Sequence, residues 1–258
     1  MDSPNQNIGC PKLRLRDMIS SLKPVLFQTC MNRLKQELEP DNFNWLEKTC
    51  QEVSDTGLNS KSKFSFSLIS RRINQKDISF ENKEKEFTES IHPYFNQLNW
   101  NNQNISRLAF LLSLNENSLK DELKSLCDYA SVKEQASIYQ SMHFIDTEGK
   151  CAPVFQEGIR TNVIETFDAL ALANPYPSLY LNESAWNQMI LKSIFMNRPL
   201  NKIHGLEDRN NLKLAHSLRD YALERKSAGR NVPDTLWSLI EPFKEQIEGI
   251  DEIISIQK

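Results

Sequence analysis

Polar side chains that can bind or activate a small molecule are concentrated between residues 157 and 209. The imidazole of His204 and the ammonium of Lys192 are groups that act as general acids or bases, and Arg160 offers a planar fork for carboxylate or phosphate. Asp208 follows His204 at a spacing that allows an acid/base pair. The candidate binding residues are Glu157, Arg160, Thr161, Asn162, Asn187, Gln188, Lys192, His204, Asp208 and Arg209. His204 and Lys192 are the candidate catalytic residues, but the pattern defines no reaction.

The helix predicted for residues 183–196 must hold three of these groups. Its apolar residues cover nearly the whole circumference, so the helix is expected to be largely buried. Asn187, Gln188 and Lys192 lie within it. An unpaired buried amide costs about 2 to 7 kcal/mol, so each group needs a partner in the protein or in a ligand.

Each candidate also has a structural interpretation. Glu157 and Arg160 could pair on a solvated helix face, and Asp208 could be a carboxylate in the first turn of a helix. The polar groups of the buried helix could cap carbonyl groups of the neighbouring loop 174–177, with the sequence NPYP. These alternatives leave the choice between binding and structure open.

No metal or cofactor is expected. One histidine and one aspartate are too few ligands, and His92, His143 and His216 show no ligand spacing. The sequence contains no GxSxG, P-loop or GxGxxG motif. The 5 cysteines are odd in number and include no CxxC pair, which argues against a disulfide framework and a structural zinc site.

The charge balance argues against nucleic acid as a partner. The chain has 31 Lys and Arg against 34 Asp and Glu, for a net charge of −3, whereas duplex-binding domains usually carry a concentrated basic face. The sequence has no stretch of about 18 uncharged apolar residues and no apolar signal core at its N-terminus. We therefore expect a cytoplasmic protein without a membrane span.

The elements that position the polar groups are expected to be helices. Glycine is scarce, at 7 of 258 residues, and helix-forming residues recur throughout. Helices are predicted near 27–38, 41–53, 64–72, 86–98, 103–112, 119–130, 132–143, 155–170, 183–196, 207–228 and 234–247. Residues 64–72 also alternate as a strand would, but a helix is preferred. The helix at 155–170 is expected to carry its apolar residues, Val163 among them, on one face.

Short connections between these helices allow two all-α arrangements. The helices can pack as a compact bundle, or as antiparallel pairs stacked in a HEAT-like α-solenoid. One domain is expected over residues 11–245, with a subdivision near 74–85 as the alternative. A disordered segment 1–10 and a tail 246–258 are expected to flank it.

Five segments carry a family resemblance: EGIRTN (157–162), FDALALANPYP (167–177), AWNQMILK (185–192), RPLNKIHGLEDR (198–209) and DYALERKSAGR (220–230). In this order they resemble the EboA family, and FNWLEK, SFSLISRRI and WNNQNISRL extend the resemblance over most of the chain. The resemblance implies a bacterial protein of secondary-metabolite processing or export, without an obvious catalytic signature. Its gene cluster would also encode a UbiA-like membrane prenyltransferase, a TatD-type metal hydrolase, a sugar-phosphate-isomerase-type barrel and a dehydroquinate-synthase-type enzyme.

Two functions follow from these residues. The first is a non-catalytic binding or scaffold protein that holds a small metabolite or a partner enzyme on a polar face of residues 157–209. The second is an enzyme acting on a small anionic metabolite, with His204 or Lys192 as acid/base and Arg160 as anion clamp. The first is favoured because the set is rich in groups that bind and poor in groups that react. Expected partners are a small metabolite or other products of the Ebo-type cluster, the UbiA-like prenyltransferase among them, which would hold the protein at the inner membrane indirectly.

Overall fold

The computed structural model describes residues 11–80, 82–91 and 95–247. In these residues it has 13 α-helices and three 3-10 helices, and the β-type pairing found there is an isolated bridge between Asp77 and Asn101. The predicted all-α fold, a packed array of helices, is therefore confirmed. The chain divides into two compact units, Met1–Phe155 (unit 1) and Gln156–Lys258 (unit 2). The expected single domain over 11–245 stays a prediction, and segment 1–10, His92 and residues 248–258 of the expected tail lie outside the described residues.

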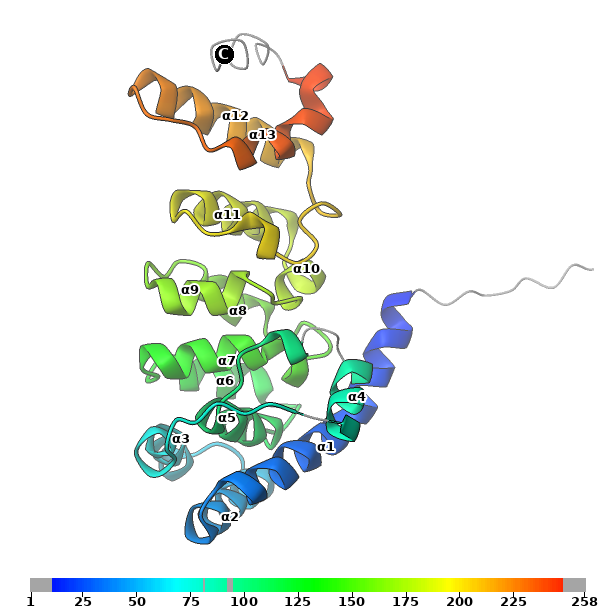
Figure 1. The fold of residues 1–258 in the computed structure, drawn as a ribbon, viewed down its shortest axis with the longest axis vertical. Helices are drawn as coiled ribbons and strands as arrows, with labels where there is room; N and C mark the ends of the chain where they lie inside the picture. Colours follow the sequence, from blue (N-terminus) through cyan, green and yellow to red (C-terminus); the bar gives the residue numbers. More distant parts are fainter. Residues whose placement is uncertain (1–10, 81, 92–94, 248–258) are drawn as a thin grey trace, which may run out of the picture. The chain divides into compact units, whose positions relative to one another are not determined.

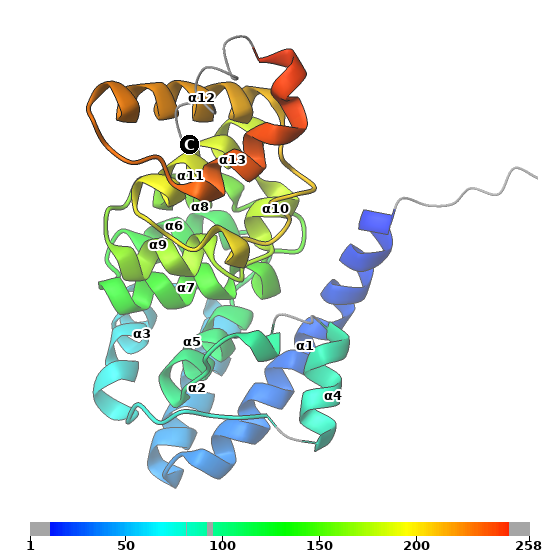
Figure 2. The same cartoon turned by 45° about the horizontal axis from the view of Figure 1, so that its top comes forward.

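Unit 1 is built around α5 (Asn102–Leu112), which packs against α1, α2, α3 and α7. The other helices are α1 (Pro11–Glu37), α2 (Pro40–Thr56), α3 (Ser60–Arg72), α4 (Asn82–Ile91), η1 (Phe95–Gln97), α6 (Leu119–Cys127) and α7 (Val132–Ile145). Helix α4 lies beside α1 (Figure 1, Figure 2). Every residue of α5 from Ile105 to Leu111 is buried, so the helix is covered on all sides.

Helix α3 confirms the helical interpretation of residues 64–72. The Asn59 side chain accepts hydrogen bonds from the backbone N–H groups of Lys61 and Ser62, and Ser62 Oγ accepts one from the Asn59 N–H. This capping box satisfies N–H groups that a helix start leaves unpaired. Phe66 is buried whereas Phe64 is 61% exposed, so the period-two alternation does not mark one buried face.

Unit 2 contains the segments with the strongest family resemblance. Its elements are α9 (Ile164–Ala171), α10 (Tyr176–Tyr180), α11 (Glu183–Phe195), η2 (Leu200–Lys202), α12 (Leu212–Ser227), α13 (Asp234–Ile240) and η3 (Glu241–Gln246), while α8 (Ala152–Gly158) spans the division between the units. Helix α12 packs against α11, α13 and η3 (Figure 1). The Asn182 side chain accepts a hydrogen bond from Ala185 N–H and caps α11, and asparagine is one of the residues favoured at this position.

The long helix predicted for residues 155–170 was wrong. The chain forms α8 and α9 instead, with a turn between Gly158 and Ile164. In that turn Thr161 Oγ1 accepts a hydrogen bond from Val163 N–H at 3.2 Å, a local bond that competes with helix formation. Val163, expected on the buried face, is 42% exposed.

The predicted start of the next long helix at Glu207 was also wrong, because α12 begins at Leu212. Its cap is Asn211, whose Oδ1 accepts a hydrogen bond from Leu214 N–H at 3.0 Å. The predicted end was correct, since Gly229 has φ +65° and Arg225 and Lys226 lie in the last turn.

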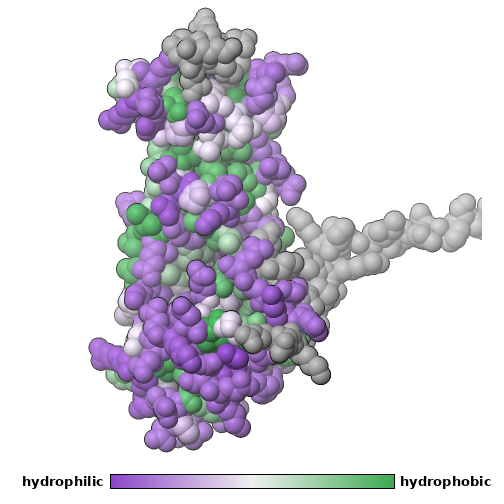
Figure 3. All heavy atoms as spheres, in the orientation of Figure 1, coloured by the Kyte–Doolittle hydropathy of each residue, from purple (hydrophilic) through white to green (hydrophobic). Residues whose placement is uncertain are grey.

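Figure 3 shows a mainly hydrophilic face over α2 and α3, with scattered apolar side chains. Among the helices of the described residues, none combines the length and the hydropathy needed to cross a bilayer.

Candidate functional site

Arg209 fastens the loop before α12 to the short helix α10. Its guanidinium donates hydrogen bonds to the carbonyl oxygens of Pro177 at 3.0 Å, Ser178 at 3.2 Å and Leu181 at 2.9 Å. The last carbonyl groups of a helix lack partners within it, and a cation near them is favourable. Arg209 was predicted as a binding residue, and the structure gives its guanidinium these internal partners.

The same guanidinium stacks on α11, with its Cζ atom 4.7 Å from the ring centroid of Trp186. Trp186 is fully buried, so this cation–π contact lies at the edge of the core. Burial lowers the pKa of Arg209, and the carboxylate of Glu183 acts in the opposite direction. Arg209 therefore connects α10, α11 and the loop before α12.

His204 is held by the same segment. Its Nδ1 lies 2.8 Å from Ser178 Oγ, and Ser178 donates its hydroxyl proton to the carbonyl oxygen of Pro175 at 2.8 Å. Because the hydroxyl has one proton, His204 Nδ1–H is the donor to Ser178 Oγ. Burial lowers the pKa of His204 and the nearby Asp208 raises it, with burial the larger effect. The imidazole is therefore neutral at neutral pH.

Gly205 allows this close contact between the loop and α10. Its φ is +70°, a conformation that favours glycine. A Cβ atom at this position would lie 2.8 Å from Ser178 Cβ, which is too close for a carbon–carbon contact. A side chain at position 205 would thus disturb the bond between His204 and Ser178.

Asn187 finds its partner at the start of α12. It exchanges two amide hydrogen bonds with Asn211, of 3.1 Å and 2.8 Å, and Asn211 Nδ2 also donates to the carbonyl oxygen of Arg209 at 3.1 Å. Asn187 is 9% exposed, so the bonds replace lost water contacts. The Asn187 side chain thus pairs with Asn211 and not with the loop 174–177.

Helix α11 is less buried than the sequence predicts. Gln188 is exposed, Phe195 is 60% exposed and Lys192 is half-buried. These residues are spaced by four and three positions, so they share the water-facing side of the helix. Lys192 Nζ lies 5.8 Å from the ring centroid of Phe167, and burial lowers its pKa.

The remaining candidates lie toward solvent. Glu157, Arg160, Asn162 and Asp208 are exposed, and Thr161 is half-buried in the turn between α8 and α9. The Arg160 N–H donates a backbone hydrogen bond to the carbonyl oxygen of Glu157 at 3.1 Å. The structure thus joins Asn187, His204 and Arg209 through Ser178 and Asn211, while the gathering of the full set stays a prediction.

The sequence reasoning missed an ion pair between Arg198 and Asp168. Arg198 Nε and Nη2 donate to the two carboxylate oxygens at 2.7 and 2.5 Å, which fastens the loop after α11 to α9. Both residues lie in the segments that resemble EboA, but helical periodicity does not relate residues 30 positions apart. Nothing in the sequence pattern around either residue indicates that the two would pair.

A cavity of about 470 Å³ borders the fastened loop. Its wall comprises Leu200, Asn201, Leu206, Glu207 and Asn210 on one side and Thr235, Ser238, Leu239 and Pro242 on the other. Its volume lies in the range of ligand sites, about 300 to 1,000 Å³. Asn210 Nδ2 donates to the carbonyl oxygen of Leu239 at 2.8 Å and ties the two sides together. Neither His204 nor Lys192 lines this cavity.

The site offers no evident metal chemistry in the part of the chain that the structure describes. There, no group of three or more His, Cys, Asp or Glu residues is placed to hold a metal ion. The functional groups that the structure brings together in unit 2 are the amides of Asn187 and Asn211, the guanidinium of Arg209 and the neutral imidazole of His204.

Fold and site together define an all-helical protein whose polar residues fasten loops beside a ligand-sized cavity. A sequence model of the EboA family, described as metabolite traffic protein EboA, matches residues 26–241. The chain therefore belongs to the EboA family, as its five ordered segments predict. No curated protein and no solved structure matches the chain.

Proposed function

We propose that this EboA-family chain is a non-catalytic binding protein of a bacterial secondary-metabolite processing or export pathway. It holds a small metabolite in the cavity between loop 200–210 and α13. The observation that carries the proposal is the combination of this cavity with the anchored loop beside it. Arg209, Asn211 and Ser178 fix the loop through bonds within the protein, so the cavity wall is preformed.

The contacts of the reactive groups favour binding over catalysis. His204 Nδ1 donates to Ser178, Lys192 lies over Phe167, and neither residue lines the cavity. An acid/base enzyme needs such groups within hydrogen-bond reach of a bound substrate. The enzyme alternative, with Arg160 as the anion clamp, would require these residues to converge on a different surface.

The cavity wall suggests what kind of metabolite fits. Leucine side chains supply an apolar surface, and Glu207 supplies the charge of the wall. A ligand with an apolar body and a hydrogen-bond donor would suit it, because a carboxylate accepts hydrogen bonds and attracts no anion.

A partner protein is the second candidate ligand. Glu157, Arg160 and Asn162 are exposed in the turn between α8 and α9, where polar side chains can contact another surface. The partner would be another product of the Ebo-type cluster, such as the UbiA-like prenyltransferase. Such contact would hold a cytoplasmic protein at the inner membrane.

The test is native mass spectrometry of the full chain purified from a bacterium that carries the gene cluster. The unmodified chain should carry a small-molecule mass, and Ser238→Trp, which fills the cavity from an exposed position, should remove it. Ser227→Trp is the matched control, because Ser227 is exposed in unit 2 and does not line the cavity. The same adduct on all three proteins would reject the cavity, and consumption of that metabolite by the purified chain would support the enzyme alternative.

A further inference from the structure

We infer that a groove between α1 and α2 of unit 1 binds an uncharged small molecule with an amide-like donor–acceptor group on an apolar body. The groove lies in the other unit from the cavity proposed above, so it is a second site. Its volume is about 630 Å³, within the range of small-molecule sites.

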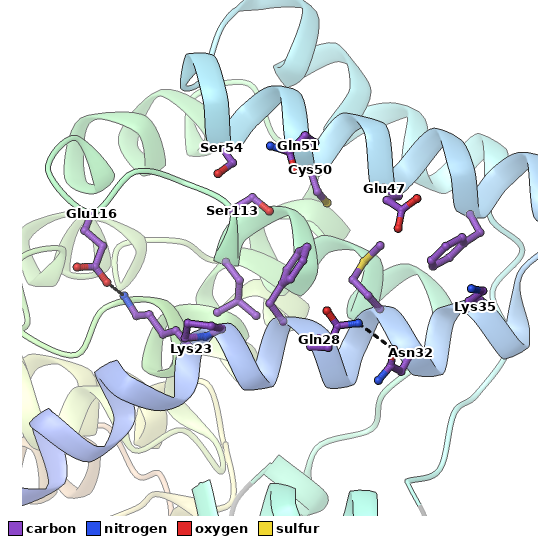
Figure 4. A pocket seen from close by; sticks show the side chains of 15 residues that line it. Lys23, Gln28, Asn32, Lys35, Glu47, Cys50, Gln51, Ser54, Ser113 and Glu116 are labelled. Atoms are coloured by element: carbon purple, nitrogen blue, oxygen red, sulfur yellow. Dashed lines mark hydrogen bonds and ion pairs between the residues drawn. The ribbon is translucent and has the colours of Figure 1, made fainter.

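The floor of the groove is apolar (Figure 4). Met31 and Phe43 are buried beneath it, and Phe27 and Leu112 are half-buried. Aromatic rings and a thioether form a surface that accepts a flat apolar body. The end of α5 contributes Leu112 and Ser113, so three helices bound the site.

An amide pair on α1 borders this floor. Gln28 Nε2 donates to Asn32 Oδ1 at 2.9 Å. Exchanging the oxygen and nitrogen of both amides would reverse this bond, and in either arrangement the pair retains an acceptor on one residue and a donor on the other. A primary amide, a lactam or a similar group presents the complementary donor and acceptor, so it could bond to both residues at once.

The charges of the groove favour an uncharged ligand. Its charged lining residues are Lys23, Lys35, Glu47 and Glu116, two of each sign. Lys23 Nζ lies 2.7 Å from Glu116 Oε1 at one end, while Lys35 and Glu47 lie toward the other end (Figure 4). The opposite charges sum to zero, so the lining has no net charge that would favour a phosphate, a carboxylate or an ammonium group.

The floor thiol gives the site no covalent chemistry. Cys50 is 1% exposed, and burial raises its pKa to about 12. A thiol with so high a pKa is protonated at neutral pH and is a poor nucleophile. Binding in the groove is therefore reversible.

The test is a ligand-observed NMR titration of the full chain with three probes that share one ring system: 2-naphthamide, 2-naphthoate and 2-naphthylmethylammonium. We expect 2-naphthamide to bind about tenfold more tightly than either ion, because only the amide offers the neutral donor–acceptor group. Equal affinity for the three probes, or no saturable binding of 2-naphthamide, would overturn the inference.

Substitutions then locate the bound probe. Gln28→Leu/Asn32→Leu should weaken 2-naphthamide binding about tenfold, because it removes both hydrogen-bond partners. Gln36→Leu/Asn44→Leu is the matched control, since both residues are exposed on α1 and α2 outside the groove. Thermal unfolding should show that both double variants are folded. Unchanged binding in the first variant, or loss of binding on Ser238→Trp in unit 2, would reject the groove as the site.

Discussion

Asn187 and Asn211 exchange two amide hydrogen bonds, and this exchange joins the middle of α11 to the first residue before α12. The arrangement uses the oxygen and the nitrogen of both amides. It converts a polar residue on a mostly apolar helix into a specific connection between two elements.

Asn187→Ala should lower the free energy of unfolding by about 1 to 3 kcal/mol, because it removes both amide hydrogen bonds between Asn187 and Asn211. Urea unfolding followed by circular dichroism measures the change. Gln188→Ala is the control, since Gln188 is the neighbouring amide and is exposed; it should change stability by about 0.5 kcal/mol or less. Equal effects of the two substitutions would contradict a structural role for the amide exchange.

Arg209→Ala should lower the free energy of unfolding by about 2 to 4 kcal/mol, because three carbonyl groups and the Trp186 ring lose the guanidinium. Arg209→Lys should recover only part of the loss, since an ammonium lacks the planar fork. Arg160→Ala, at an exposed arginine, provides the comparison. If Arg209→Ala were as stable as Arg160→Ala, the anchoring role would be wrong.

Lys192→Ala should change the free energy of unfolding by about 0.5 kcal/mol or less in the absence of ligand. The reason is that its ammonium is half-buried, makes a 5.8 Å contact with the Phe167 ring and remains accessible to water. Differential scanning calorimetry of the two proteins measures the difference. A large loss would make Lys192 a structural residue and remove it from the candidate binding set.

Stability should fall below about pH 6.5 in part because of His204. Burial lowers the pKa of this residue in the folded chain, so the unfolded chain binds the proton more readily. The neutral imidazole therefore contributes to folding stability at pH values above the pKa that His204 has in the unfolded chain. This contribution is lost as the pH falls through the lower pKa that His204 has in the folded chain. Urea unfolding at pH 7.5 and 5.5 should show a smaller difference for His204→Gln than for the unmodified chain. His216→Gln controls for the loss of a histidine, and an unaltered pH dependence in His204→Gln would reject this account.

Apolar periodicity predicted most elements because it reports which face of a helix is buried. It predicted the bounds of α5, α7 and α11 closely. It failed at Val163, where the apolar spacing continues across a turn. The Thr161 hydroxyl accepts a hydrogen bond from the Val163 N–H there, and this bond competes with the backbone hydrogen bonds of a helix. Because the competition does not alter the spacing of the apolar residues, the apolar pattern gives no sign of the turn.

The candidate site was predictable in composition but not in its pairings. Residue type identified Asn187, His204 and Arg209 as candidate site residues. Their partners, Asn211, Ser178 and the carbonyl groups around α10, depend on how distant segments pack, which one sequence does not encode locally. The partial exposure of α11 could not be predicted for a related reason. An apolar residue such as Phe195 can lie at the surface, so apolar residues all around a helix do not prove that every side is covered.

The contact between Gly205 and Ser178 has an evolutionary consequence. Position 205 requires a left-handed backbone, and the two positions share a volume too small for another methyl group. In relatives that keep the His204 contact, we expect glycine to persist at 205 and the residue at 178 to remain small. A relative with a larger residue at 178 should also carry a compensating change in the length or path of its 203–211 loop, so the two sites should covary.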